Sequence, residues 1–180
     1  MSDNFKLQPI QNWLKKNNWF FYDHQLETLN QSINGYDILL IAPTGGGKTL
    51  AGFLPSLHDL INNNSPENKL HTLYISPLKA LTIDVHRNLT NPIEDQNLDI
   101  RVETRTGDTS SYKKNRQKNV PPHMLMTTPE SLALLLADIK AKEYFKSLRY
   151  LIIDEIHSLV NTKRGDLLSL NLSRLCLLYT

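Results

Sequence analysis

The sequence predicts an α/β fold with a mainly parallel central sheet that helices cover on both faces. Short apolar runs of strand length recur along the chain, and longer segments between them carry apolar residues at helical spacing. Strands that alternate with helices favour a parallel sheet buried on both sides. The chain has 180 residues, of which 40% are hydrophobic, which suffices for one domain with a sizeable core.

Five apolar runs predict the strands of this sheet. The first (DILLIA) and the last (YLIID) are almost continuously apolar, which fits strands buried on both sides, although a buried helix segment has a similar pattern. The predicted strands are Asp37–Ala42, Thr72–Ser76, Ile100–Thr104, Met124–Thr127 and Tyr150–Asp154. Apolar residues at helical spacing predict helices over Thr49–Ile61, Leu78–Leu89 and Leu167–Leu178.

The first residues of the chain stand apart from this alternation. Ile10, Trp13 and Leu14 would share one face of a short helix, so residues 1–20 are expected to form a helical lead-in to a domain over residues 21–180. No apolar run approaches the roughly 20 residues that span a bilayer, and no signal-peptide stretch opens the sequence. We therefore expect a soluble, cytoplasmic protein without membrane contact.

Charge and cysteine content exclude several classes of function. Lys and Arg total 20 against 18 Asp and Glu, so the net charge of +2 does not by itself indicate a nucleic-acid or membrane partner. Cys176 is the only cysteine in the sequence. An internal disulfide framework, a thiolate zinc cluster and an iron-sulfur site built from this chain alone are therefore excluded.

A glycine-rich loop follows the first predicted strand and precedes a predicted helix. It reads Ala42-Pro43-Thr44-Gly45-Gly46-Gly47-Lys48-Thr49. Glycines allow close backbone approach to a triphosphate, and the amide groups of a helix N-terminus favour anions. In such a loop the lysine reaches the terminal phosphates and the Thr49 hydroxyl can bind the accompanying magnesium. The loop predicts a nucleotide site formed by Thr44, Gly45, Gly46, Gly47, Lys48 and Thr49.

Two adjacent carboxylates follow the last predicted strand, in the run Asp154-Glu155-Ile156-His157. Ligands of parallel sheets gather outside the carboxyl ends of the strands, which suits phosphate chemistry at this position. We assign Asp154 to Mg²⁺ and Glu155 to polarising the attacking water. A zinc site at His157 is not expected, because no second histidine stands at a suitable offset.

With both motifs in place, the chain resembles the first RecA-like domain of superfamily 2 DExH helicases, and most closely the Lhr (large helicase-related) family. Ala42 stands where the general loop pattern has its first glycine, and the A-P-T-G-x-G-K-T form occurs in superfamily 2 helicases. Further matching segments are Ser76–Leu81 (SPLKAL), Arg105–Thr109 (RTGDT), Thr127–Leu132 (TTPESL) and Lys163–Gly165 (KRG). The resemblance implies a P-loop RecA-like three-layer sandwich, incomplete at its C-terminus.

The resemblance also implies a role for each matched segment. Gln25 matches the glutamine that reads adenine, which implies ATP as the nucleotide, and His157 matches a residue that couples hydrolysis to strand movement. The segments SPLKAL and TTPESL correspond to loops that hold the sugar-phosphate backbone of one strand, and Arg105 with its neighbours is expected on the same face. The implied nucleic-acid contacts are Ser76, Pro77, Lys79, Arg105, Thr106, Gly107, Thr128 and Pro129.

Two of these roles have a plain structural alternative. Gln25 could be an ordinary helix glutamine, and Ser76, Thr128 and Glu130 could be plain helix caps. Residues 101–123 carry six basic side chains and two acidic ones. This stretch could form a local basic patch that binds nucleic acid, or a solvated helix face without a partner.

The matched motifs end with the segment after DEIH. In this family a strand ending in Ser-Ala-Thr lies between the phosphate-loop strand and the DEIH strand, and a second RecA-like domain supplies arginine fingers. Because neither is present here, we expect a portion of a longer helicase that hydrolyses ATP weakly, does not unwind alone, and has a gap at the sheet centre.

The sequence thus favours the ATP- and nucleic-acid-binding portion of an ATP-dependent DNA or RNA helicase, with ATP and Mg²⁺ as cofactors. One alternative is a nucleotide-dependent nucleic-acid-binding module that does not unwind. The other is a P-loop ATPase unrelated to nucleic acid, which would be indifferent to SPLKAL, TTPESL and the basic stretch.

Overall fold

A computed structural model describes residues 7–43, 45–63 and 68–178 of the chain. These residues fall into two compact units, which are described separately below. The first comprises Met1–Ser65 and Asn88–Ile100, and the second Pro66–Arg87 and Arg101–Thr180. Helix α4 (Lys79–Asp95) contributes residues to both units. No helix among the described residues is long and apolar enough to cross a membrane.

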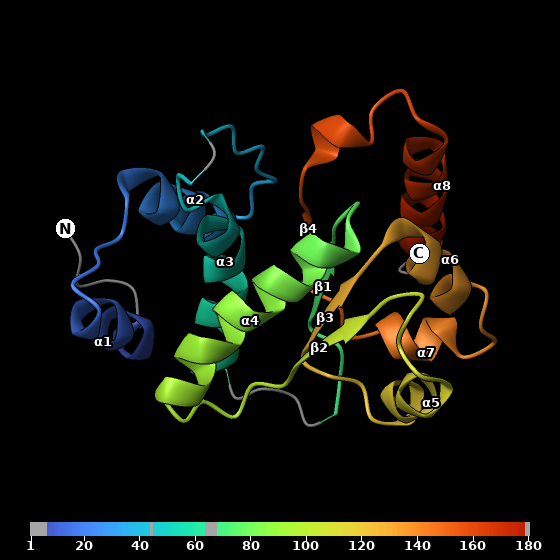
Figure 1. The fold of residues 1–180 in the computed structure, drawn as a ribbon, viewed down its shortest axis with the longest axis horizontal. Helices are drawn as coiled ribbons and strands as arrows, with labels where there is room; N and C mark the ends of the chain where they lie inside the picture. Colours follow the sequence, from blue (N-terminus) through green and yellow to red (C-terminus); the bar gives the residue numbers. More distant parts are fainter. Residues whose placement is uncertain (1–6, 44, 64–67, 179–180) are drawn as a thin grey trace. The chain divides into compact units, whose positions relative to one another are not determined.

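The second unit is an α/β unit built on a four-stranded sheet (Figure 1). Its strands are all parallel and lie in the order β2-β3-β1-β4. Their bounds are Thr72–Ile75 for β1, Val102–Arg105 for β2, Met124–Thr127 for β3 and Tyr150–Ile153 for β4. Strands β1 and β3 are buried along their whole length, as their almost purely apolar sequences predict.

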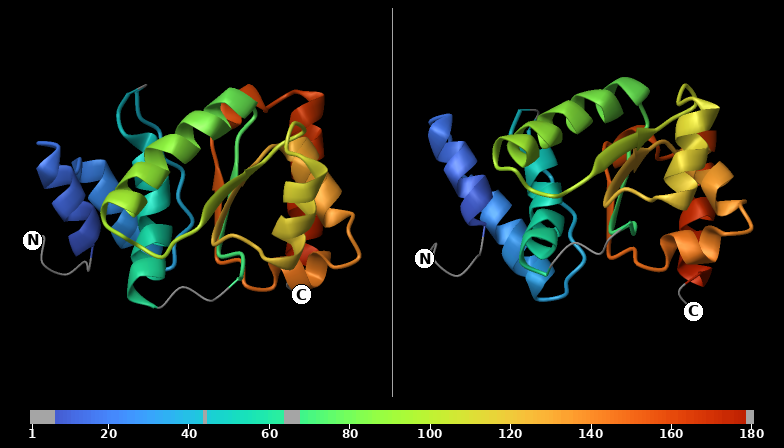
Figure 2. Two further views of the ribbon diagram at one scale, coloured as in Figure 1. Left: turned by 60° about the horizontal axis from the view of Figure 1, so that its bottom comes forward. Right: turned by 90° about the horizontal axis from the view of Figure 1, so that it is seen from below.

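Helices cover both faces of this sheet, as the alternating pattern predicts. The part of α4 that belongs to this unit lies on one face, and four helices lie on the other (Figure 2). These are α5 (Ser111–Asn119), α6 (Pro129–Leu136), α7 (Ala141–Phe145) and α8 (Lys163–Leu177). Between sheet and helices lies an apolar core that includes Leu73, Ile75, Leu125, Leu132, Phe145 and Leu168.

The first unit is helical. It contains α1 (Gln8–Lys16), α2 (Asp23–Ile33), α3 (Lys48–Asn62) and the last turns of α4. The predicted lead-in helix is confirmed, because Ile10 and Leu14 are buried on one face of α1. The Trp13 indole N–H donates to the Asp95 carboxylate at 3.2 Å, which ties α1 to the end of α4. The boundary at residue 20 stays a prediction.

The predicted strand at Asp37–Ala42 is wrong. This segment forms no strand, and its apolar side chains are turned outward, with Leu39 74% and Ile41 86% exposed. An extended segment becomes a strand only when a neighbour accepts and donates its backbone hydrogen bonds, and no described strand pairs with it. Strand β4 correspondingly lies at the edge of the sheet, with Leu151 exposed.

The other predicted elements are confirmed with small shifts of their ends. Strand β2 starts two residues later than predicted, because Ile100 belongs to the preceding turn, where its N–H donates to the Leu98 carbonyl. Helix α4 continues past Leu89 to Asp95 in spite of Pro92, and α8 begins already at Lys163 behind the cap Thr162. Apolar spacing marks the buried middle of a helix more clearly than its polar ends.

Candidate active site and nucleic-acid interface

The glycine-rich loop opens helix α3 in the first unit. Gly45 and Gly47 have backbone φ angles of +79° and +72°, in the left-handed region that favours glycine. Gly47 is the N-cap residue of α3, and its carbonyl accepts from the Ala51 N–H at 3.1 Å. The loop therefore presents its backbone at the positive end of a helix dipole. Thr44 lies outside the described residues.

The two polar side chains after the glycines begin α3. Lys48 folds back over the loop, and its ammonium donates to the carbonyls of Ala42 at 2.7 Å and Pro43 at 3.1 Å. Thr49 follows on the first turn and is half-buried. Carbonyl oxygens are weaker partners for an ammonium than phosphate oxygens, so this geometry leaves Lys48 available to an anion held by the loop.

Gln25 contacts this loop directly. Its side-chain amide is buried on α2, with the oxygen accepting from the Tyr22 N–H at 2.9 Å and the nitrogen donating to the Gly47 carbonyl at 3.1 Å. The first bond belongs to a capping box, so Gln25 does serve its helix. The second bond joins α2 to the glycine-rich loop at the start of α3.

The DEIH segment lies in the second unit, directly after β4. The Asp154 N–H donates to the Ile75 carbonyl of β1 at 2.9 Å, which continues the pairing of the two strands. The Asp154 carboxylate accepts from the Glu155 N–H at 2.8 Å and from the Tyr74 hydroxyl at 2.7 Å. Burial of the ring and the neighbouring carboxylate raise the pKa of Tyr74 above its usual range, so the phenol keeps its proton and remains a donor.

Glu155 has an unusual backbone conformation for a residue with a side chain. Its φ angle is +49°, in the left-handed region, and such residues are concentrated at functional sites. The imidazole Nε2 of His157 lies 3.3 Å from the Glu155 carboxylate, and the His157 side chain is largely exposed. Glu155 and His157 are thus brought together on the short 3₁₀ turn Ile156–Ser158.

No metal cage built from protein side chains occurs within residues 7–43, 45–63 and 68–178. Mg²⁺ in nucleotide sites is held by one or two carboxylates together with phosphates and water. The Asp154 carboxylate is a ligand of this type, and two hydrogen bonds fix its orientation.

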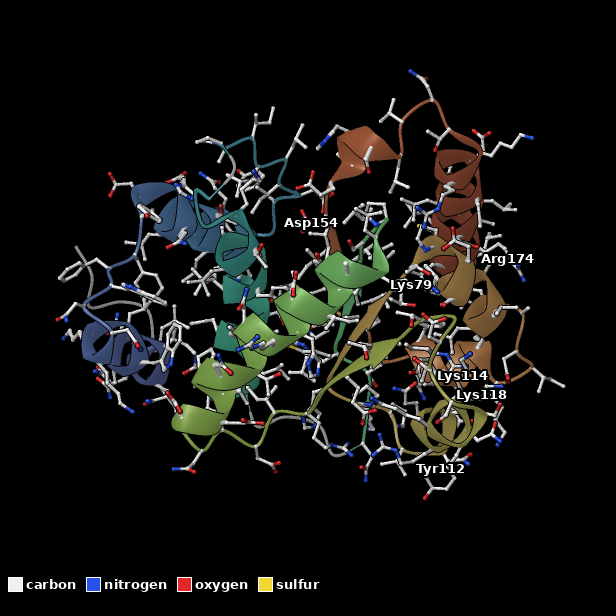
Figure 3. All side chains as sticks on the ribbon, in the orientation of Figure 1. Lys79, Tyr112, Lys114, Lys118, Asp154 and Arg174 are labelled. Atoms are coloured by element: carbon white, nitrogen blue, oxygen red, sulfur yellow. The ribbon has the colours of Figure 1, made fainter. Side chains whose placement is uncertain are left out.

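The segments matched to nucleic-acid loops gather at the carboxyl ends of β1, β2 and β3. Lys79 begins α4 after β1, and Asp108 lies in the loop after β2. The Lys79 ammonium contacts both oxygens of the Asp108 carboxylate, at 2.9 and 2.8 Å. The Thr127 hydroxyl at the end of β3 donates to the Arg105 carbonyl at the end of β2, at 2.8 Å. Figure 3 shows Lys79 and Asp154 at this end of the second unit.

A second bidentate ion pair joins TTPESL to KRG. The Arg164 guanidinium donates to both oxygens of Glu130, at 2.5 and 3.1 Å, and links the first turns of α8 and α6. This bond lowers the pKa of Glu130 to about 2 and raises that of Arg164. The family resemblance includes both segments but does not predict that they contact each other.

The predicted nucleic-acid residues differ in exposure. Lys79 and Gly107 are exposed, whereas the six others are buried. Thr128 occupies the N-cap position of α6, but its side chain makes no capping hydrogen bond to the helix backbone, and its hydroxyl lies 3.5 Å from that of Ser131. The buried ones are Ser76, Pro77, Arg105, Thr106, Thr128 and Pro129. Any contact of these loops with a phosphate would therefore use backbone N–H groups or hydroxyls at the loop surface.

Arg105 faces into the unit rather than outward. Its guanidinium donates to the Lys114 carbonyl at 2.8 Å and to the Gln117 side chain at 3.4 Å, and burial lowers its pKa. The side chain therefore anchors α5 to β2. This does not fit a direct side-chain contact with nucleic acid.

The basic stretch around α5 is largely paired within the second unit. Arg116 donates to Glu103 and Lys118 to Asp138, each at 2.5 Å, and the Lys114 ammonium donates to the Gly107 carbonyl at 2.9 Å. Lys114 and Lys118 are labelled on α5 in Figure 3. Most of these basic side chains thus bind partners within the second unit and hold α5 in place. This favours a helix face without a nucleic-acid partner over a basic patch for nucleic acid.

Comparison with known proteins places these motifs in a family. The sequence profile of the DEAD/DEAH box helicase family matches residues 22–180. The chain is 40% identical to the ATP-dependent helicase Lhr-Core of Methanothermobacter thermautotrophicus, over 92% of this chain and 21% of the relative. It is 38% identical to the Lhr helicase/uracil glycosylase of Escherichia coli, over 87% of this chain and 11% of the relative.

Solved structures agree with this match. The helicase Lhr of Mycobacterium smegmatis, bound to ssDNA and AMP-PNP, is similar with a TM-score of 0.84 and 37% identity, over 98% of this chain and 23% of that one. The DUF1998 helicase MrfA is similar with a TM-score of 0.85 and 28% identity, over 99% of this chain and 27% of that one. This likeness confirms the predicted RecA-like fold. The chain spans about a fifth of the length of the Lhr-Core relative that it matches.

Proposed function

Because the chain belongs to the DEAD/DEAH box helicase family, we propose that it forms the ATP-binding and nucleic-acid-binding portion of an ATP-dependent helicase that acts on DNA or RNA. The observation that supports this most directly is the likeness, over 98% of the chain, to a helicase solved with both ssDNA and AMP-PNP. In the whole protein, ATP hydrolysis would drive movement along one strand.

In this proposal the first unit holds the nucleotide. Gly45, Gly46 and Gly47 with Thr44 surround the phosphates, Lys48 exchanges its carbonyl partners for phosphate oxygens, and Gln25 reads the adenine edge. The bond from Gln25 to the Gly47 carbonyl supports this assignment, since it holds the adenine-reading amide against the phosphate loop. ATP is therefore the nucleotide that we expect to bind.

The carboxylates after β4 supply the hydrolytic groups. Asp154 and the Thr49 hydroxyl would hold Mg²⁺, which when bound neutralises charge on the phosphates. Glu155 would orient and polarise the attacking water by accepting its proton. The His157 imidazole Nε2 lies 3.3 Å from the Glu155 carboxylate. This contact supports the proposed role of His157 in coupling hydrolysis to strand movement.

The carboxyl ends of β1, β2 and β3 would bind one strand of nucleic acid. Lys79 supplies a charged contact, and the loops at Ser76–Pro77, Thr106–Gly107 and Thr128–Pro129 supply backbone N–H groups and hydroxyls. Arg105 acts here by holding the Thr106–Gly107 loop against α5. Contacts of this kind read the sugar-phosphate backbone, so no base specificity is expected.

The whole protein would contain more than this chain. We propose a second RecA-like domain as the partner that supplies arginine fingers, without which turnover falls by roughly a thousandfold or more in P-loop enzymes. The chain alone would therefore hydrolyse ATP weakly. We place its action in the cytoplasm, where ATP and nucleic acid are both available.

Binding of a fluorescent ATP analogue with Mg²⁺ tests the proposed function. We expect saturable binding that Lys48→Ala abolishes, while Lys15→Ala, which removes an exposed lysine of α1, leaves it unchanged. Circular-dichroism melts check that all three proteins fold. Binding that Lys48→Ala leaves intact would contradict the assignment of the loop. A folded wild-type chain that binds ATP but shows no salt-dependent affinity for single-stranded DNA or RNA would favour an ATPase unrelated to nucleic acid.

A further inference from the structure

One side chain that sequence reasoning did not select connects the two regions of the second unit that the proposed function uses. Tyr74 lies in the middle of β1 and is 1% exposed. Its position pairs with Ile152 of β4, so its ring stands beside the strand that leads to Asp154. The Tyr74 hydroxyl donates to the Asp154 carboxylate at 2.7 Å across 80 residues of sequence.

This bond, together with a second one, fixes the orientation of the Asp154 carboxylate. One oxygen accepts from the Glu155 N–H at 2.8 Å, and the other accepts from Tyr74. A carboxylate held on both oxygens cannot rotate about its Cβ–Cγ bond without breaking a hydrogen bond. Its remaining lone pairs therefore point in defined directions, which is what a metal ligand in a nucleotide site requires.

A loop of the nucleic-acid surface begins beside the same tyrosine. Ser76 follows Tyr74 by two residues, and its N–H donates to the Thr127 carbonyl, which continues the pairing of β1 with β3 and sets the Ser76 side chain on the same face of the sheet as Tyr74. Ser76 is fully buried, and its oxygen also lies 3.5 Å from the Leu78 backbone N–H, in the turn before α4. Movement of this turn, which leads to Lys79, would displace Ser76 and with it the end of β1 beside Tyr74.

We propose that Tyr74 is a positioning residue that orients the Asp154 carboxylate for Mg²⁺-ATP and couples this carboxylate to the nucleic-acid loop at Ser76. The inference rests on the proposed function and names a residue through which one site acts on the other. The link is short, since it consists of the hydrogen bond from Tyr74 to Asp154 and of Ser76, the next residue on the same face of the strand.

The test compares Tyr74→Phe with a matched control, Tyr144→Phe. Both tyrosines are buried in the second unit, but no partner for the Tyr144 hydroxyl is found among the described residues, so this variant removes the same atom without breaking a bond. The measurement is the Mg²⁺ concentration at half-maximal binding of a fluorescent ATP analogue, with and without a single-stranded DNA oligonucleotide.

We expect Tyr74→Phe to raise this Mg²⁺ midpoint by about tenfold, the lower range for loss of a partner that orients a metal ligand. We expect wild type to shift its midpoint when DNA is added, and Tyr74→Phe and Ser76→Ala to lose that shift. Tyr144→Phe should behave as wild type in both conditions. In an Asp154→Asn background, Tyr74→Phe should have no further effect on the Mg²⁺ midpoint, because its action passes through the carboxylate.

Other outcomes overturn the inference in distinguishable ways. A wild-type chain without Mg²⁺-dependent binding contradicts the proposed function and the inference with it. Wild-type binding together with an unchanged midpoint in Tyr74→Phe, or equal shifts in both tyrosine variants, overturns the positioning role alone. A DNA-induced shift that survives in Ser76→Ala, or is missing in wild type, overturns the coupling. A Tyr74→Phe protein that does not melt cooperatively would make the hydroxyl a folding requirement, which also overturns the proposal.

Discussion

Gln25 and Gly47 lie 22 residues apart in sequence and are joined by a hydrogen bond of 3.1 Å from the glutamine amide to the glycine carbonyl. A Cβ atom at Gly47 would lie 2.5 Å from the Gln25 nitrogen, so the two residues leave no space between them. The glycine thus serves two purposes, since it permits a φ of +72° and admits the side chain that holds the loop.

The contact predicts the effect of Gln25→Glu. A glutamate at this position keeps the capping box of α2, because one of its oxygens still accepts from the Tyr22 N–H. Its second oxygen replaces the amide nitrogen that donates to the Gly47 carbonyl, so two acceptors face each other without a proton between them. We expect a loss of about 1–3 kcal/mol in the free energy of unfolding, the cost of a buried acceptor without a donor, together with weaker nucleotide binding. Urea unfolding at pH 7 measures the first and fluorescence titration the second.

Gln31→Glu is the control, since Gln31 lies on the exposed side of the same helix, where its amide contacts Glu27. Only a few tenths of a kcal/mol are expected there. Equal losses in the two variants would show that the charge, and not the contact with Gly47, decides the result.

The KRG segment contains a glycine that packing demands. A Cβ atom at Gly165 would lie 2.2 Å from the Leu159 carbonyl oxygen, which is backbone and cannot turn aside. We expect Gly165→Ala to lower the free energy of unfolding by about 1–3 kcal/mol through overpacking, in spite of the better helix propensity of alanine. Thermal melts compare it with Gly107→Ala, whose Cβ would lie 3.6 Å from the nearest atom, the Lys79 ammonium nitrogen. A Gly165→Ala chain as stable as Gly107→Ala would contradict the close approach.

The Glu130–Arg164 pair predicts a specific pH dependence. The pKa of Glu130 is lowered from 4.5 to about 2, so the pair contributes stability that is complete above pH 4.5 and is lost as the pH falls toward 2. Because both side chains are 40–50% exposed, we expect a contribution of about 1 kcal/mol or less.

Melting temperatures of wild type and Arg164→Met measured between pH 7 and pH 2 test this dependence. The difference between the two proteins should shrink below pH 4.5 and vanish near pH 2. A difference that stays constant over this range would mean that Arg164 stabilises the chain through packing and not through the Glu130 charge.

The Lys79–Asp108 pair predicts that removal of a negative charge strengthens nucleic-acid binding. Asp108 holds the Lys79 ammonium with both oxygens, and it also repels an approaching phosphate. An exposed pair of this kind contributes less than about 1 kcal/mol, so a phosphate can replace the carboxylate. We expect Asp108→Asn to raise the affinity for single-stranded DNA by about two- to fivefold and to steepen its salt dependence by about 0.7, the value of one further phosphate contact.

Fluorescence anisotropy over a series of salt concentrations gives both quantities. Asp99→Asn makes the same charge change in the first unit and should alter neither. If Asp108→Asn binds more weakly than wild type, Asp108 supports the interface instead of competing for Lys79.

Both functional motifs and most elements of the fold could be read from the sequence. The loop Ala42–Thr49 and the run Asp154–His157 are local patterns, because their chemistry depends on residues adjacent in the chain. Strands β1 and β3 are buried along their whole length and are apolar except for one threonine each, so local sequence suffices to identify them as well.

Tertiary structure alone decided which side chains meet. The apolar run Asp37–Ala42 has the composition of a buried strand, yet it forms none, because a strand depends on a neighbour that local sequence does not specify. A buried tyrosine needs a hydrogen-bond partner for its hydroxyl, but the sequence does not say which residue this is. The parallel register of β1 and β4 decides it, because it brings the Asp154 carboxylate to 2.7 Å from the Tyr74 hydroxyl. Arg116 and Lys118 of α5 pair with Glu103 and Asp138, whose side chains are only 12% and 22% exposed. A partly buried carboxylate favours a paired cation, and the fold decides which cation lies beside it.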